Sequence, residues 1–174
     1  MKINVSKKNI ITAIVIISVF CIALGAFIAN KSNVKFRDDY NQAFSFSEKK
    51  MIINYFKAVD EYVDIIEKSS DLTNMDAVKF LDENKKIIEE YEANKEKIKA
   101  YGDKYDAENL TVTNQKELID ILRKRSILTD YLEIDIKILE TIEQLIEGNC
   151  TDDTIAQLKE KVKDVKGKYF ILEK

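Results

Sequence analysis

The sequence predicts an all-α protein in which a single N-terminal transmembrane helix precedes an antiparallel bundle of three to four helices. Three observations carry this prediction. Twenty consecutive uncharged residues lie near the N-terminus, apolar residues recur at every third or fourth position over most of the remainder, and the 174 residues include no proline and only four glycines. So few helix breakers disfavour a turn-rich β-sandwich or barrel, and no segment alternates apolar and polar residues as a half-buried strand does.

The N-terminal apolar segment is the strongest single feature of the sequence. A short basic tail, residues 1–9, carries three lysines and precedes the uncharged stretch, residues 10–29. At a rise of about 1.5 Å per residue, this stretch makes a helix of about 30 Å, which matches the hydrocarbon core of a bilayer. A buried helix of a soluble protein is disfavoured because no polar face interrupts the stretch. We therefore expect a transmembrane helix that acts as a signal anchor.

Two alternatives concern cleavage or lipidation of this segment. Residues 23–25 (Ala-Leu-Gly) form an acceptable small-x-small cleavage site, and cleavage there would leave a secreted bundle. The apolar residues continue beyond that site to Ala29, which favours the uncleaved anchor. Cys21 would be the modified residue of a lipoprotein signal, but the bulky Phe20 stands where such signals have a small residue.

The charges that flank the segment do not orient it by themselves. Three lysines precede it and three basic residues follow it closely, so the positive-inside rule gives a tie. A short N-terminal tail with a helix directly after it favours the usual signal-anchor arrangement, in which the C-terminal body is translocated. We expect a single-pass protein of the cell membrane with an extracytoplasmic C-terminal domain.

Residues 30–45 are expected to form a helical juxtamembrane segment. Three aromatic residues follow one another there at four-residue spacing, which places them on one face of a helix. The first long helix of the body is therefore expected to begin either near Asn33 or near Ser47.

A helical bundle domain is expected over residues 46–174. Apolar stripes with helical spacing are separated by segments that contain Ser, Asp, Thr or Gly, which provide caps and turns. The connections are short enough to make consecutive helices antiparallel neighbours. The first predicted helix ends at Ser69, and the second runs from Thr73 or Asn74 to about Gly102. The third runs from Thr111 or Thr113 to Gly148, and the fourth begins at Thr151 or Asp152.

The third of these helices is predicted to lie between at least two neighbours. Its apolar residues, which include Leu132 and Leu139, cover an arc of roughly 240° at about 100° per residue, whereas one partner needs an arc about half as wide. The fourth helix carries a narrow apolar stripe and many lysines, which predicts a peripheral position.

Composition excludes several classes of chemistry. The chain has no histidine, so it cannot form a Ser-His-Asp or Cys-His nucleophile, a histidine-ligated zinc site or a Glu-x-x-His metal pair. Its two cysteines, Cys21 and Cys150, lie in segments of different character and make no disulfide framework. Every acidic residue follows residue 37, so the body is mildly acidic, unlike a nucleic-acid-binding face. We expect no catalytic residue, cofactor, metal site, nucleic-acid partner or enzymatic activity.

Asp135 is the candidate for a buried polar residue, because it falls near the middle of the apolar arc of the third predicted helix. It would contact a ligand, or it would reach a lysine on a neighbouring helix. The structural role is favoured because one carboxylate without a convergent partner makes no site. The tyrosines of the apolar stripes are expected to pack in the core or in helix seams, with an aromatic recognition groove as the alternative.

The C-terminal segment is a candidate for contact with the membrane surface. If the body is extracytoplasmic and its helices alternate in direction, the last helix returns toward the bilayer, where aromatic and apolar residues flanked by lysines suit the interface. The alternative is that the segment simply closes the bundle. The residues concerned are Lys166, Lys168, Tyr169, Phe170, Ile171 and Leu172.

Together these features favour a membrane-anchored bundle that acts through protein–protein contact in the cell envelope, as a scaffold, adaptor or assembly subunit. Its partner would be an unknown protein or a second copy of the chain. The alternative is a ligand-sensing or binding bundle that signals through a partner. The order of elements is similar to that of the four-helix ectodomains of bacterial chemoreceptors. The sequence shows neither a second transmembrane helix nor a cytoplasmic output domain, so that resemblance is architectural.

Overall fold

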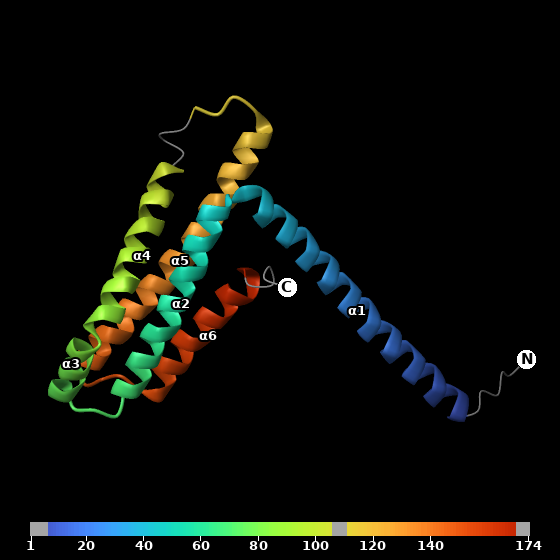
Figure 1. The fold of residues 1–174 in the computed structure, drawn as a ribbon. Helices are drawn as coiled ribbons and strands as arrows, with labels where there is room; N and C mark the ends of the chain where they lie inside the picture. The colour runs from blue at the N-terminus through green and yellow to red at the C-terminus, as the bar shows by residue number, and fades with distance from the viewer. Residues whose placement is uncertain (1–6, 106–110, 170–174) are drawn as a thin grey trace, which may run out of the picture. The chain divides into compact units, whose positions relative to one another are not determined.

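A computed structural model describes residues 7–105 and 111–169, apart from the side chains of residues 7–17, 20, 33 and 36. Over these ranges the chain is helical and contains no strand, which confirms the predicted all-α class (Figure 1). Six helices are present in the described ranges: α1 (Lys7–Ala43), α2 (Phe46–Ser69), α3 (Asn74–Glu83), α4 (Lys85–Lys104), α5 (Gln115–Ile146) and α6 (Asp152–Tyr169).

The chain divides into two compact units, residues 1–38 and residues 39–174. In the first unit, α1 runs without a break from Lys7 and includes both the predicted transmembrane stretch and most of the juxtamembrane segment. No helix within the described residues is both long enough and apolar enough to cross a membrane. The side chains of residues 10–17 and 20, which belong to the predicted span, lie outside the described residues.

The second unit is a helical bundle. The helices α2, α4, α5 and α6 alternate in direction (Figure 1), and each packs against two flanking helices in the cyclic order α2, α4, α5, α6. The short α3 packs against α2 and α5 in addition to its neighbour α4. Because α5 contacts α2, α3, α4 and α6, the prediction that it lies between at least two neighbours is confirmed.

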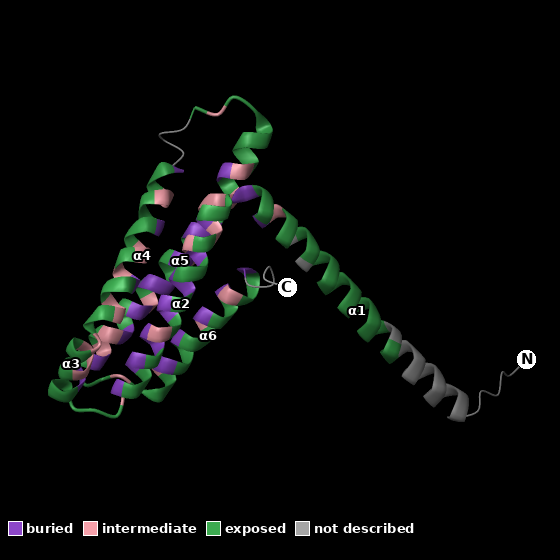
Figure 2. Cartoon of the chain, viewed as in Figure 1, coloured by how far each residue is buried: buried purple, intermediate pink, exposed green. Residues whose placement is uncertain are grey.

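The core of the bundle lies on the facing sides of these helices, where buried residues follow one another at helical spacing (Figure 2). Four large side chains in its centre are fully buried, at 0% exposure: Tyr55, Tyr91, Tyr131 and Phe56. On α6 the buried residues form the predicted narrow stripe: Ile155, Leu158, Val162, Val165 and Tyr169.

The bundle begins earlier than the predicted boundary at residue 46. Its compact unit starts at Asp39 because the last turn of α1 contributes to the core. The side chains concerned are 5% exposed or less: Tyr40, Ala43 and Phe44.

Neither Asn33 nor Ser47 starts the first bundle helix. The chain leaves the helical conformation after α1, and Ser45 caps α2 through a capping box. The Ser45 N–H donates to Glu48 Oε2 at 2.6 Å, and the Glu48 N–H donates to Ser45 Oγ at 3.4 Å. These reciprocal bonds satisfy free N–H groups at the helix start, so they define the boundary.

The predicted second helix is divided into α3 and α4. Thr73 caps α3 as expected, but the helix is interrupted at Asn84, whose side-chain amide donates to the Phe80 carbonyl at 2.8 Å. Such a local bond competes with the helical pattern. The third predicted helix also begins later than expected, since Asn114 caps α5 by accepting from the Glu117 N–H at 2.9 Å.

Candidate functional site

Asp135 lies in the centre of the bundle with an exposure of 2%, as its sequence position predicts. Its partners are tyrosines, not a lysine. Tyr55 of α2 donates to Asp135 Oδ1 at 2.6 Å, and the hydroxyl of Tyr91 on α4 donates to the same oxygen. Asp135 thereby joins α2, α4 and α5 through two hydrogen bonds at one atom.

Burial dominates the electrostatics of this cluster. It raises the pKa of Asp135, while the hydrogen bonds from Tyr55 and Tyr91 act in the opposite direction. Burial and the nearby Asp135 raise the pKa of both tyrosines, so they stay protonated and serve as donors. Asp135 Oδ2 and the Tyr131 hydroxyl are buried without a hydrogen-bond partner among the described residues.

Aromatic rings enclose this carboxyl group. The rings of Tyr55 and Tyr131 lie 5.3 Å apart, and Tyr62 stacks on Tyr91 at 4.8 Å. Tyr131 in turn contacts Tyr169 at 5.7 Å. These tyrosines therefore pack in the core, as expected, and the cluster joins the helices.

A second polar cluster joins the ends of three helices. Glu48, at the start of α2, accepts from the Tyr105 hydroxyl at 3.3 Å and lies 3.8 Å from the Lys124 ammonium of α5. Burial acts to raise the pKa of Glu48, but the bonds from Ser45 and the charge of Lys124 outweigh it, so the pKa is lowered. Glu48 is thus an ionised carboxylate in a structural network.

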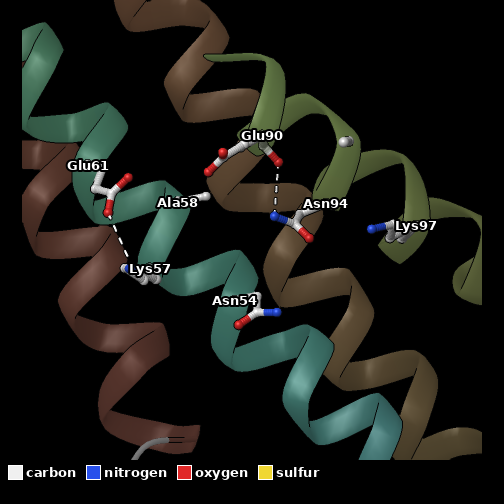
Figure 3. Close-up of a pocket in the computed structure, with 8 residues that line it drawn as sticks. Asn54, Lys57, Ala58, Glu61, Glu90, Asn94 and Lys97 are labelled. Atoms are coloured by element: carbon white, nitrogen blue, oxygen red, sulfur yellow. Dashed lines mark hydrogen bonds and ion pairs between the residues drawn. The ribbon is translucent and has the colours of Figure 1, made fainter. Parts of the chain in front are cut away.

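One groove between helices of the bundle is lined mainly by polar residues. Figure 3 shows the groove between α2 and α4, whose volume is about 270 Å³. Four of its residues form two pairs, each within one helix: Lys57 with Glu61 at 3.9 Å, and the Asn94 amide with the Glu90 carbonyl at 2.9 Å. No group of three potential metal ligands occurs in residues 7–105 and 111–169.

Three of the six C-terminal residues with a predicted membrane contact lie within the described part of the chain. Tyr169 is 5% exposed, and its hydroxyl donates to Asp130 Oδ2 at 2.5 Å. The predicted surface contact is therefore wrong for Tyr169, because its ring completes the core. The ammonium groups of Lys166 and Lys168 pair with Asp60 of α2 and with Asp130 of α5. Phe170, Ile171 and Leu172, for which a membrane contact was also predicted, lie outside the described residues.

The main exposed apolar feature of the bundle is a row of large side chains on α5, here called the α5 stripe. Its members lie on the longest helix of the bundle and are 42–57% exposed: Leu118, Leu122, Leu132, Ile136, Leu139 and Ile146. Arg125, Thr129 and Glu143 complete a spacing that alternates strictly between four and three residues from Leu118 to Ile146. This is the heptad spacing of a helix that packs against another helix.

The apolar spacing alone did not reveal this surface, because residues such as Leu132 and Leu139 were assigned to the core. Leu132 and Leu139 are 42% and 43% exposed, while Tyr131 and Ile138 beside them are fully buried. The signal was present in the wide apolar arc of the predicted helix. An arc of roughly 240° holds one stripe for the bundle and a second for another partner.

Comparison of the chain with protein-family models, curated proteins and solved structures found no match.

Proposed function

We propose that the protein is a single-pass, membrane-anchored helical bundle that acts through protein–protein contact in the cell envelope, as a scaffold, adaptor or assembly subunit. The α5 stripe is the observation that carries this proposal. Six large apolar side chains half-exposed in one row exceed the scattered apolar residues of an ordinary surface, and such rows mark interaction sites.

The membrane part of the proposal rests on the sequence of residues 10–29, which has spanning length and no charge. Cys150, between α5 and α6, offers a test of topology in intact cells. A Cys21→Ser variant is treated with a membrane-impermeant maleimide, and lysed cells provide the control. The lysed control is essential because burial and Asp152 raise the pKa of the Cys150 thiol and slow its reaction. Labelling of a membrane-bound, full-length chain in intact cells is expected, and labelling only after lysis would refute the extracytoplasmic position.

The contact function is tested by photo-crosslinking from the α5 stripe. A photoreactive amino acid replaces Ile136 in the full chain, and a second variant carries it at the exposed Lys163 of α6. We expect one discrete protein adduct from position 136, lost when Leu132→Asp is added, and none from position 163. Equal adducts at both positions, or none at position 136, would refute docking on the α5 stripe.

A further inference from the structure

The α5 stripe carries a charge pattern that selects its partner. Two charged residues occupy positions of its heptad spacing, Arg125 in the N-terminal half and Glu143 in the C-terminal half. The whole helix has the same polarity. Residues 115–125 have a formal net charge of +2, and residues 126–146 have a net charge of −4. A helix surface with opposite charges at its two ends is complementary to the same surface of a second copy that runs in the opposite direction.

One antiparallel register pairs the members of the stripe with one another, apart from Leu118, whose counterpart in that register, residue 150, lies beyond the end of α5. If residue 134 of one α5 lies opposite residue 134 of another, Arg125 faces Glu143 of the second copy. The same register places apolar residues against one another, or against Thr129, without any further adjustment. The pairs that follow are Leu122 with Ile146, Leu132 with Ile136, and Thr129 with Leu139, each formed twice by symmetry. In the heptad repeat these pairs join complementary a and d positions, as antiparallel helix packing requires.

We propose that the α5 stripe binds a second copy of this chain, in an antiparallel pairing of the two α5 helices about a two-fold axis near residue 134. This inference rests on the proposed function, because it names the partner of the same surface. A parallel pairing is disfavoured, since it would place Arg125 against Arg125 and Glu143 against Glu143. The antiparallel pairing replaces both repulsions with attraction between opposite charges.

The region next to the axis has one unfavourable pair, which the bundle itself compensates. Glu133 flanks the stripe and lies near its own counterpart in this register. In each chain, however, Glu133 forms an ion pair with Lys161 of α6. The two carboxylates therefore meet as neutralised pairs.

Cysteine crosslinking of the full chain tests the register. In detergent, a Cys21→Ser, Cys150→Ser background receives Glu133→Cys, Leu122→Cys or Ile146→Cys, and circular dichroism verifies the helical content. We expect Glu133→Cys to form a disulfide-linked dimer with itself on mild oxidation. We expect Leu122→Cys and Ile146→Cys to crosslink when mixed and not when alone. A dimer of Leu122→Cys with itself, or no crosslink in any combination, overturns the proposal.

A charge exchange tests the same pairing without cysteines. The dimer dissociation constant is measured by sedimentation equilibrium of the full chain in detergent. Arg125→Glu and Glu143→Arg each place two like charges in contact, so each should weaken the dimer roughly tenfold, and the double variant should restore it. Lys163→Glu makes the same charge change outside the stripe and should have no effect. Failure of the double variant to restore the dimer overturns the pairing.

These outcomes separate the two proposals. If position 136 gives a discrete photo-adduct with a different protein while the purified chain stays monomeric, the antiparallel pairing is refuted and docking on the stripe stands. If neither experiment finds an adduct or a dimer, both proposals fail.

Discussion

The two hydrogen bonds to Asp135 predict a specific and pH-dependent loss of stability in a Tyr55→Phe variant. The substitution removes only the hydroxyl group that donates to Asp135 Oδ1 at 2.6 Å, in a residue with 0% exposure. A hydrogen bond to a charged group contributes about 1.5–3 kcal/mol to stability. Since Tyr91 still donates to the same oxygen, we expect a loss of about 2 kcal/mol in the free energy of unfolding at pH 8, from the lower half of that range.

The loss should be smaller in acid. Burial raises the pKa of Asp135 in the folded state above its ordinary value of 3.8. The unfolded chain therefore ionises first, and the contribution of Asp135 to stability falls as the pH rises from 3.8 through the folded pKa. Removal of the Tyr55 donor raises the folded pKa further, which extends that fall. At pH 3 the carboxyl group is neutral, so the loss should be about 1 kcal/mol.

Urea unfolding of the full chain in a nonionic detergent, followed by far-ultraviolet circular dichroism, measures this difference. Tyr62→Phe is the matched control, because its ring stacks on Tyr91 at 4.8 Å while Asp135 accepts only from Tyr55 and Tyr91 within the described part of the chain. The control should lose less than about 0.5 kcal/mol. Equal losses for the two variants, or a Tyr55→Phe loss that does not grow with pH, would refute the assigned role of the Asp135 cluster.

Three further substitutions test the remaining parts of the bundle by the same unfolding assay. Ile138→Ala should cost about 2–5 kcal/mol because Ile138 is fully buried, and Leu139→Ala, at 43% exposure, should cost less than about 1 kcal/mol; the reverse order would contradict the division of α5 into core and stripe. Gly148→Ala should cost at least about 1 kcal/mol, because Gly148 has a φ of +73° and an added Cβ would lie 2.7 Å from Asn74 Oδ1. Gly102→Ala adds a Cβ in open space within α4 and should instead stabilise the protein by up to about 1 kcal/mol. Glu48→Gln should cost about 1 kcal/mol at pH 7, and this difference should vanish in acid. The pKa of Glu48 is lowered from 4.5, so its contribution to stability is present above pH 4.5 and is lost as the pH falls through the folded pKa. A difference that persists at the lowest pH would contradict an ionised Glu48.

The periodicity of apolar residues was enough to predict the helices, their order and the burial of Asp135. It was not enough to predict where helices break when the break depends on a side-chain bond. Ser45 marks the start of α2, and Asn84 marks the break between α3 and α4, through hydrogen bonds to groups within four residues. Neither residue is of a different type from the polar residues around it. The tyrosine partners of Asp135 could not be predicted from the sequence either. Tyr55 and Tyr91 lie 80 and 44 residues away in the chain, and they meet Asp135 only in the folded bundle.

The width of the apolar arc on α5 links the fold to the proposed function. A helix in a closed bundle buries the apolar residues that face its neighbours. Apolar residues on its outer face are not needed for folding, and they expose apolar surface to water. On α5, Ile134 and Ile138 satisfy the bundle at 0% exposure, while Ile136 and Leu139 stay 57% and 43% exposed on a separate heptad row. Packing within one chain explains the first set alone. A helix partner explains the second, and the placement of Arg125 and Glu143 within that same row explains why the partner should be a second α5 in the opposite direction.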